Sequence, residues 1–483
     1  MLAPLNLPAF RRLWAADMIS LLGDWAGRLA LTVLVLERTG SPAWAAAVTA
    51  VSLAGYVGIG QVLATLADRH GRVSVMLAAD VARASLFLMM LLDVPVGVLL
   101  VLAFLAGLAT PPFEAARSAA LPDLVPEEDY RDALALSGIS VQFSLVLGYA
   151  LGGILLTIVH PEAALAINAC SFLVSAVLLL KLRGSAAAQP AAVPSTVSRS
   201  LGDGAAMLFG DRMVRRALVF VSVTGALGTV DEALVVPYAE RIGLPPGYLG
   251  ILAASIPIGT LLATMVIAGG RRDHHSLLRT AGWCGVITSA LAAPLFWFEA
   301  TGWMAFVAFA ISGGMFAVSI PTNTVIGLRL TRDTRASAMG IAVGVLMGSQ
   351  ALGAAVGGLV ASVVGSPRAI GGALAAAAVF SLWAVATTPA DAKHLAPRHR
   401  LRQRCPCPRP SCSRNRPWRP PTPLSTSWPW RASSSRRPVA GEPAAPRLRI
   451  PGHAPFHLHR SSCRAHGGDR RVPRVRPGGL RVR

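Results

Sequence analysis

Long apolar segments recur along most of the chain and are separated by short polar turns. Each segment is long enough to cross about 30 Å of hydrocarbon at about 1.5 Å of rise per residue, as a transmembrane helix must. A polar stretch over residues 183–216 divides the segments into two sets. The segments begin near Leu13, Ala43, Val73, Val96, Leu134 and Ala163 in the first set, and near Ala217, Gly247, Ser276, Gly302, Ala338 and Ala369 in the second. This pattern predicts an all-α membrane protein with about twelve transmembrane helices in two six-helix bundles.

The same pattern predicts the domain organisation. We expect one six-helix bundle over residues 1–183, a cytoplasmic central linker over 184–213, a second six-helix bundle over 214–390, and a tail over 391–483. The first apolar segment has the length of a full membrane span and carries no short hydrophobic core with a cleavage site, so we interpret it as a retained helix and not as a signal peptide.

An internal repeat relates the two predicted bundles. A glycine pattern in the fifth segment returns in the eleventh with a constant offset of 205 positions. The glycines are Gly148, Gly152 and Gly153 in the first bundle and Gly353, Gly357 and Gly358 in the second. Small residues let helix backbones approach closely in lipid, so these glycines either only pack the helices or also allow the two halves to rock. Two related halves around a central cavity are a common plan of secondary transporters.

Basic residues predict the orientation of the chain, because short cytoplasmic loops are enriched in arginine and lysine. One set of alternate loops is rich in these residues and includes Arg72 and Arg272, whereas the other set has only Arg38, Arg241 and Arg368. We therefore expect a multi-pass protein of the cell inner (plasma) membrane with both termini in the cytoplasm.

Composition agrees with a membrane protein. The chain is 53% hydrophobic and 14% charged, whereas an ordinary soluble domain is about a quarter charged. The formal net charge of +21 does not indicate a nucleic-acid partner, because the part after Pro397 holds 21 arginines against only Glu442 and Asp469. That Arg/Pro-rich tail is expected either to be disordered or to be an out-of-frame reading with no selected function.

Ionisable residues inside the segments are the candidate site residues, because a charge at a helix centre costs about 2.5 to 3.5 kcal/mol on insertion scales and usually faces a cavity or a partner. Asp24 and Arg28 have the spacing of an intrahelical ion pair, so they either face the cavity or only neutralise each other. Glu114 and Arg117 form a similar couple in the fourth segment, in which Arg117 has either a structural role or a role at the substrate or the gate.

The seventh segment contains Asp231 and Glu232, which point about 100° apart and have no basic residue nearby in the sequence. A buried carboxyl without a partner can hold or release a proton when access switches between two aqueous phases. Together with Asp24, these residues are candidates for proton and cation handling. Asp80 and Arg83, three positions apart in the third segment, predict a structural ion pair instead.

Residues 64–72, between the second and third segments, resemble the cytoplasmic loop signature of the major facilitator superfamily. Asp68, Arg69, Gly71 and Arg72 match that signature, whereas Ala64 stands where the family usually has glycine. A carboxylate at Asp68 could face a helix N-terminus or a guanidinium of the other half and latch the cytoplasmic side shut, and the alternative is a simple loop cap.

Other stretches resemble the exporters of this superfamily. Residues 148–153 are similar to its antiporter signature, with Tyr149 in place of the usual proline, and residues 10–14, 20–24 and 116–122 resemble the macrolide and siderophore exporter branch. The resemblance implies proton-driven efflux of small amphiphilic molecules from the cytoplasm. An importer of the same fold and a membrane receptor or scaffold without transport are the alternatives.

Enzymatic motifs are missing from the sequence. The only lysines are Lys181 and Lys393, so there is no Walker A motif, and no H-E-x-x-H zinc motif occurs. We therefore expect no enzymatic activity, no cofactor and no metal, with the proton gradient as energy source. The expected partners are a small-molecule substrate, protons and lipid but no nucleic acid, and the expected state is a monomer.

Overall fold

The computed structural model describes residues 3–58, 63, 70–182, 197–268, 274–330 and 335–388. Within these ranges every regular element is a helix, and all the helices belong to one compact unit, Met1–Arg402. The predicted tail lies outside the described residues. The chain is therefore the all-α membrane protein that its hydrophobic pattern predicts.

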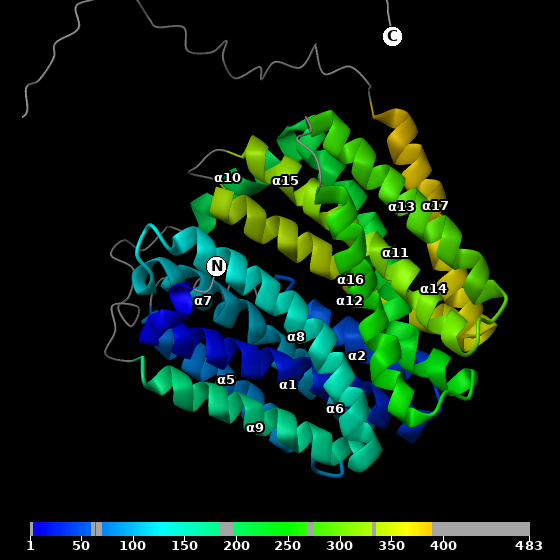
Figure 1. The fold of residues 1–483 in the computed structure, drawn as a ribbon, viewed down its shortest axis with the longest axis horizontal. Coiled ribbons are helices and arrows are strands. Elements are labelled where there is room, and N and C mark those ends of the chain that lie inside the picture. The colour runs from blue at the N-terminus through cyan, green and yellow to red at the C-terminus, as the bar shows by residue number, and fades with distance from the viewer. Residues whose placement is uncertain are drawn as a thin grey trace, which may run out of the picture. The chain divides into compact units, whose positions relative to one another are not determined.

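The first bundle is formed by the helices before the central linker, which lie together in Figure 1. Proline occupies the first turn of several of its helices, where the missing N–H group would have no partner in the helix. Its helices are α1 (Pro8–Thr39), α2 (Pro42–Ala54), α5 (Arg72–Met89), α6 (Val96–Leu108), α7 (Thr110–Leu124), α8 (Tyr130–Ile158) and α9 (Pro161–Leu180), after the 3-10 helix η1 (Ala3–Asn6). The fourth span consists of α6 and α7, which meet just before Pro111 and Pro112.

The second bundle repeats this plan. Its helices are α11 (Arg212–Arg241), α12 (Pro246–Ala268), α13 (His274–Trp297), α14 (Trp303–Gly313), η3 (Gly314–Val318), α15 (Ser319–Arg329), α16 (Arg335–Val364) and α17 (Ser366–Thr387). The tenth span, made of α14, η3 and α15, is broken in the middle like the fourth. Before this bundle, α10 (Val197–Gly210) forms the second part of the predicted linker and packs against α16.

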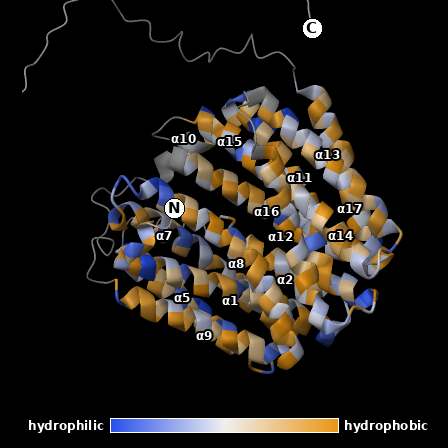
Figure 2. Ribbon diagram, in the orientation of Figure 1, coloured by the Kyte–Doolittle hydropathy of each residue, from blue (hydrophilic) through white to orange (hydrophobic). Residues whose placement is uncertain are grey.

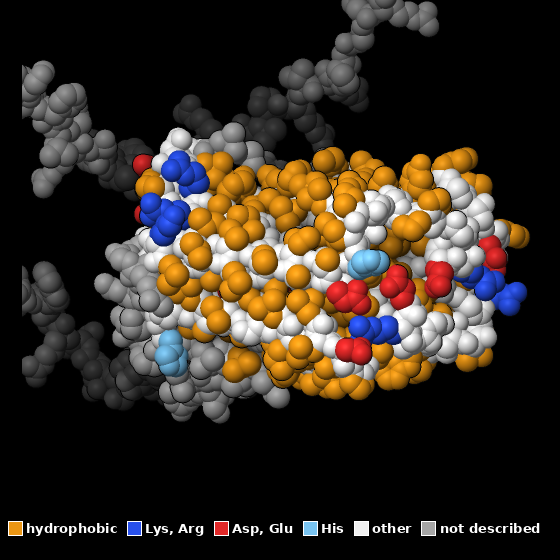
Figure 3. All heavy atoms as spheres, turned by 90° about the horizontal axis from the view of Figure 1, so that it is seen from below, with side chains coloured by type: hydrophobic (Ala, Val, Ile, Leu, Met, Phe, Trp, Pro, Cys, Tyr) orange, Lys and Arg blue, Asp and Glu red, His pale blue; other side chains and the backbone are white. Residues whose placement is uncertain are grey.

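Ten spans in the described part of the chain are long and apolar enough to cross a membrane. The two other expected spans correspond to α2, a shorter apolar helix, and to α5, which carries three charged residues among 18. Apolar residues cover these helices along their length (Figure 2), and the face seen in Figure 3 is largely apolar with charged side chains in separate groups. Val266, Phe298 and Val363 are each at least 80% exposed, which is costly in water and favourable in lipid.

Two helices from each bundle make most of the contact between the bundles, and α11 also packs against α2 and α1. In the first bundle α1 packs against α8 and α9, and in the second α11 packs against α16 and α17. Across the boundary, α8 packs against α12 and α2 packs against α16. The first helix of each bundle, α1 or α11, therefore lies next to a helix that touches the opposite bundle.

Two equivalent arginines at the ends of α1 and α11 support the internal repeat. Arg38 lies 3.8 Å from Asp93 and 3.5 Å from Glu162, and Arg241 lies 2.7 Å from Glu299. Asp93 and Glu299 both belong to the turn between the third and fourth spans of their own bundle. The two arginines therefore make equivalent contacts, as expected for duplicated halves.

Candidate functional site

Two of the carboxyls inside the first bundle pair with an arginine on their own helix. Asp24 and Arg28 lie 3.6 Å apart on α1, as their four-residue spacing predicts. Asp80 and Arg83 lie 2.5 Å apart on α5, which confirms the predicted ion pair. Local helical spacing therefore accounts for both contacts.

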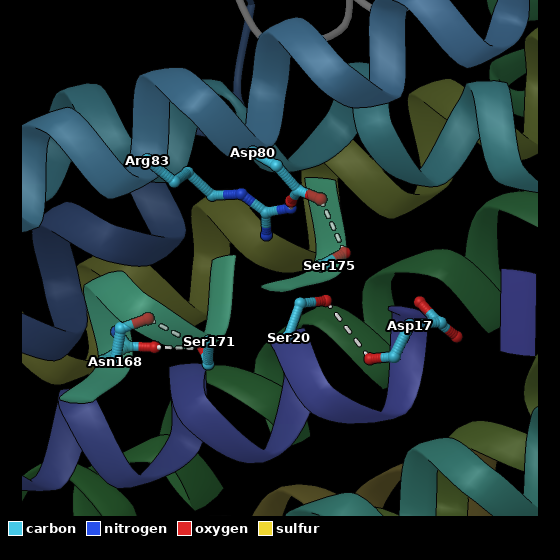
Figure 4. A network of polar contacts seen from close by, with 7 residues as sticks. All are labelled: Asp17, Ser20, Asp80, Arg83, Asn168, Ser171 and Ser175. Carbon is cyan, nitrogen blue, oxygen red and sulfur yellow. Dashed lines mark hydrogen bonds and ion pairs between the residues drawn. The ribbon is translucent and has the colours of Figure 1, made fainter. Parts of the chain in front are cut away.

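The Asp80–Arg83 pair is part of a buried polar cluster between α5 and α9 (Figure 4). Ser175 of α9 donates a hydrogen bond of 2.6 Å to Asp80. The guanidinium carbon of Arg83 lies 4.7 Å from the ring centre of Phe113 and 4.4 Å from that of Phe172. With 0% and 4% exposure, Asp80 and Arg83 compensate each other's charge inside the bundle, so their role is structural.

The expected pairing of Glu114 with Arg117 is wrong. Arg117 of α7 instead donates to Asp17 of α1 at 3.1 Å, and the carboxylate of Glu114 accepts a hydrogen bond of 3.0 Å from the Tyr56 hydroxyl. Residues three apart share one helix face, but the packing of α1 and α2 against this part of the bundle brings Asp17 and Tyr56 within reach. Glu114 is thus left without an arginine ion pair in the described part of the chain.

A hydrogen bond joins the two bundles near their centre. The hydroxyl of Tyr149 on α8 donates to the carboxylate of Glu232 on α11 at 2.8 Å. The ring of Tyr149 packs against Trp25 of α1, with ring centres 5.4 Å apart and planes inclined by 54°. Tyr149 stands where the antiporter signature usually has proline, so this residue supplies a contact that a proline could not make.

Asp231 points away from this contact into the second bundle. Its side chain is buried at 1% exposure beside Ser312 of α14, and neither carboxylate oxygen has a well-formed hydrogen bond within the described part of the chain. Adjacent helix residues point about 100° apart, which explains why Asp231 and Glu232 face different surroundings. Inside apolar surroundings an ionised carboxylate without a partner is costly.

A small cavity adjoins the Asp24–Arg28 pair. Its volume is about 20 Å³, and polar side chains of Asp24, Arg28, Ser52 and Tyr56 line it together with apolar groups such as Phe87. A polar cavity of this size has room for one water molecule. The pair is therefore in contact with a space in which a proton or a small polar group can be accommodated.

The loop signature is only partly described. Asp68 and Arg69 lie outside the described residues, so the proposed latch at Asp68 stays a prediction. Gly71 occupies the N-cap position of α5, and Arg72 in the first turn forms an ion pair with Asp123 near the end of α7. Arg72 thereby ties the start of the third span to the end of the fourth.

The repeated glycines lie at close helix contacts, and the three glycines of each bundle have equivalent neighbours. In each bundle the first two glycines pack on the first helix of their own bundle, and the third packs on the other bundle. In the first bundle, Gly148 and Gly152 lie against Trp25 and Ala26 of α1, and Gly153 lies against Gly250 of α12. In the second bundle, Gly353 and Gly357 lie against Ala226 and Val230 of α11, and Gly358 lies against Ala43 and Ala46 of α2.

Three aromatic residues at this site were not predicted from the sequence. Tyr56 and Tyr149 contact carboxylates that lie far away in the sequence, so helical spacing gives no signal for them. Trp25 contacts Arg28 three positions further along α1, so its spacing was a signal that the sequence did contain. The sequence did offer one hint for the tyrosines, because tyrosine is rare in this chain. It has only five, and two of them, Tyr56 and Tyr149, lie inside or next to the apolar segments.

Comparison with known proteins places this arrangement in a family. Residues 1–406 match the family described as transmembrane secretion effector, a branch of the major facilitator transporters. The MFS-type transporter YfiS of Bacillus subtilis is 28% identical over 371 residues, which are 74% of this chain and 88% of YfiS. Macrolide efflux protein A of Streptococcus pyogenes is 24% identical over 179 residues, which are 36% of this chain and 44% of that protein.

Solved transporters share the fold. A bacterial homolog of the human lysosomal transporter Spinster, in an inward-facing and unoccupied conformation, superposes with a TM-score of 0.62 at 15% identity, over 78% of this chain and 96% of that one. A point mutant of the nucleoside transporter NupG superposes with a TM-score of 0.62 at 16% identity, over 79% of this chain and 98% of that one. A POT family transporter in complex with 5-aminolevulinic acid superposes with a TM-score of 0.64 at 14% identity, over 79% of this chain and 96% of that one. The chain is therefore a transporter and not an enzyme, and it belongs to the transmembrane secretion effector family of the major facilitator superfamily.

Proposed function

We propose that this transporter exports small amphiphilic molecules of drug, macrolide or siderophore type from the cytoplasm in exchange for protons. The observation that carries the proposal is the set of membrane carboxyls that form no ion pair with an arginine in the described part of the chain. These carboxyls are Glu114, Asp231 and Glu232.

Such carboxyls have the chemistry that proton coupling needs. An ionised carboxylate inside the membrane is costly when no positive group compensates it, so it exchanges protons readily when water reaches it. Glu114 and Glu232 each contact a tyrosine hydroxyl, which donates to a carboxylate and can accept from a protonated carboxyl. Both contacts are therefore compatible with either protonation state.

The position of Glu232 couples protonation to the contact between the bundles. Its hydrogen bond to Tyr149 connects α11 of one bundle to α8 of the other, and a hydrogen bond to a charged group is stronger than one to a neutral group. Loss of the charge on Glu232 weakens this connection. Rigid-body rocking of two halves then gives a route from proton binding to a change of access.

Asp24 is the candidate for handling the cationic group of a substrate. Its ion pair with Arg28 is long, at 3.6 Å, and lies beside the small polar cavity. Arg117, by contrast, is engaged with Asp17. The loop residues Asp68, Arg69, Gly71 and Arg72 are proposed as the cytoplasmic gate, and the repeated glycines as the packed surfaces on which the halves rock.

The direction of transport is proposed from two supports. The chain is similar over part of its length to macrolide efflux protein A, and its fifth span resembles the antiporter signature. The distribution of basic residues supports a location in the cell inner membrane with both termini in the cytoplasm. We further propose that the transporter works as a monomer.

Uptake into inverted membrane vesicles tests the proposal, because the cytoplasmic face of such vesicles points outward. Vesicles from cells expressing the full chain should accumulate ethidium or labelled erythromycin when acidified inside, and an uncoupler should abolish the accumulation. A variant with Asp24→Asn, Asp231→Asn and Glu232→Gln should lose it, whereas Glu128→Gln on an exposed loop should not.

Each negative result has its own meaning. Accumulation that survives the uncoupler or the triple variant would remove proton exchange at these residues from the mechanism. Absence of accumulation with gradient-driven movement in the opposite direction would indicate an importer, and absence of any movement would favour a receptor or scaffold.

A further inference from the structure

Arg28 is held in an unusual way for an arginine inside a membrane protein. Its guanidinium lies 3.6 Å from Asp24, beyond hydrogen-bonding distance, and it makes no hydrogen bond to any residue that the structure describes. A guanidinium has five N–H donors, and arginines in structural pairs usually direct them at oxygen atoms. Arg83 of the same bundle also lies over aromatic rings, but it donates a hydrogen bond to Asp80 at 2.5 Å, which Arg28 does not do to Asp24.

An aromatic face takes the place of the missing hydrogen bonds. The guanidinium carbon of Arg28 lies 4.5 Å from the ring centre of Trp25, within the range of a cation–π contact. Tyr149 packs against the same tryptophan, and its hydroxyl donates to the carboxylate of Glu232. Trp25 and Asp24 thus lie directly beside the positive group, and Tyr149 and Glu232 follow next to Trp25.

This environment suits a different class of cation better than it suits arginine. Ring faces and carboxylates attract a positive charge without requiring N–H donors, as in the aromatic cages that bind quaternary ammonium groups. The charges also favour a cation, because Asp24 and Glu232 outnumber Arg28. An anionic ligand would meet two carboxylates here.

We infer that the face of Trp25 between Asp24 and Glu232 binds the positively charged group of the transported molecule, and that Arg28 occupies this place when the substrate is absent. Arg28 is a tethered competitor: it neutralises Asp24 in the empty transporter and moves aside when an organic cation enters. This inference rests on the proposed function and assigns its substrate class. Trp25 and Arg28 then determine specificity, with Arg28 acting against the substrate.

Equilibrium binding with two probes of equal shape and opposite charge tests the inference. Labelled tetraphenylphosphonium and tetraphenylborate are measured at pH 8 on the full chain in nanodiscs, with empty nanodiscs subtracted for partition into lipid. The wild type should bind the phosphonium in preference to the borate. Trp25→Leu should weaken phosphonium binding about tenfold, whereas Trp303→Leu, which changes a 73% exposed tryptophan, should have no effect.

The arginine variants give the decisive comparison. Arg28→Gln should bind the phosphonium about tenfold more tightly than the wild type, because the competitor is removed, and Arg28→Lys should stay near the wild type. Arg368→Gln on the exposed surface is the matched control. Elution as a single peak and an unchanged unfolding temperature verify that each variant is folded.

Weaker phosphonium binding by Arg28→Gln, or a preference of the wild type for tetraphenylborate, would overturn the inference. Because this measurement uses no gradient, its failure is separable from failure of the proposed function. Proton-driven ethidium accumulation without the expected binding pattern would refute only the role of Trp25 and Arg28. The expected binding pattern without any accumulation would refute only proton-coupled export.

Discussion

At the scale of single residues, the distribution of arginines sorts the membrane carboxyls into two kinds. Asp17, Asp24 and Asp80 each have a guanidinium within 3.6 Å. Glu114, Asp231 and Glu232 have no such guanidinium in the described part of the chain, and two of them, Glu114 and Glu232, contact tyrosine hydroxyls instead. The first kind can remain charged at modest cost, and the second is suited to gaining and losing protons.

The Asp80–Arg83 pair predicts a stability effect. Arg83→Ala or Asp80→Ala leaves a buried charge without compensation, which should cost about 3–5 kcal/mol. The double variant Asp80→Leu/Arg83→Met removes both charges and should be much less destabilised. Thermal unfolding of the purified protein in detergent measures the difference, and a double variant as unstable as the sum of the single ones would contradict the structural role.

Residue pairs also show how far the sequence alone could predict the site. Asp24–Arg28 and Asp80–Arg83 were predictable, because residues three or four apart lie on one face of a helix. Glu114 and Arg117 have the same spacing, but other helices supply each of them with a different partner. The contacts of Arg117 with Asp17 and of Tyr149 with Glu232 join positions 100 and 83 apart. Only the packing of the helices decides such contacts, so helical spacing could not find them.

At the scale of helices, the hydrophobic pattern predicted the fold well, because a span must be apolar over its whole length. It placed the fourth and tenth spans but not their breaks at α6–α7 and at η3. The broken spans remain apolar throughout, so the break leaves no trace in hydropathy. In the fourth span Pro111 and Pro112 marked the place, since proline cannot continue a hydrogen-bonded helix.

Glycine contacts between helices predict a position-specific effect within α8. Gly153→Ala introduces a methyl group against the backbone of Gly250 in the other bundle, whereas Gly138→Ala meets nothing within 4 Å. Gly153→Ala should therefore lower the transport rate and the unfolding temperature, and Gly138→Ala should leave the rate unchanged and slightly raise the temperature. Equal behaviour of the two variants would argue against close α8–α12 packing.

The start of α11 predicts a dependence of stability on pH. The Asp211 carboxylate accepts hydrogen bonds from the backbone N–H groups of Met213 and Val214, and it lies 3.2 Å from Arg329. Partial burial by itself would raise the pKa of Asp211. The two N–H groups and the Arg329 guanidinium outweigh this effect and hold the pKa below its ordinary value.

Because the pKa is lowered by folding, this stabilisation is complete above the unfolded-state pKa and is lost as the pH falls through the folded-state value. Asp211→Ala should cost about 1 kcal/mol at neutral pH and progressively less in acid. Asp211→Asn, which keeps a capping side chain, should cost less than Asp211→Ala. Unfolding in detergent at several pH values measures both, and a cost for Asp211→Ala that grows in acid would contradict this assignment.

At the scale of the whole molecule, two duplicated bundles meet mainly through α2, α8, α12 and α16. A hydrogen bond from Tyr149 of α8 to Glu232 of α11 also crosses between them. Under the proposed function, proton exchange, the charge of the substrate and the contact between the halves lie within one region. Alternating access in such a molecule requires that events in this region change how the bundles pack.

Proton movement driven by substrate tests this account most directly. Purified full-length protein is reconstituted in liposomes that contain a pH-sensitive dye, and an ethidium gradient is imposed without any initial pH gradient. The account predicts that protons move against the direction of ethidium, and that Glu232→Gln and protein-free liposomes show no such movement. Ethidium transport without proton movement, or with protons moving in the same direction, would contradict it.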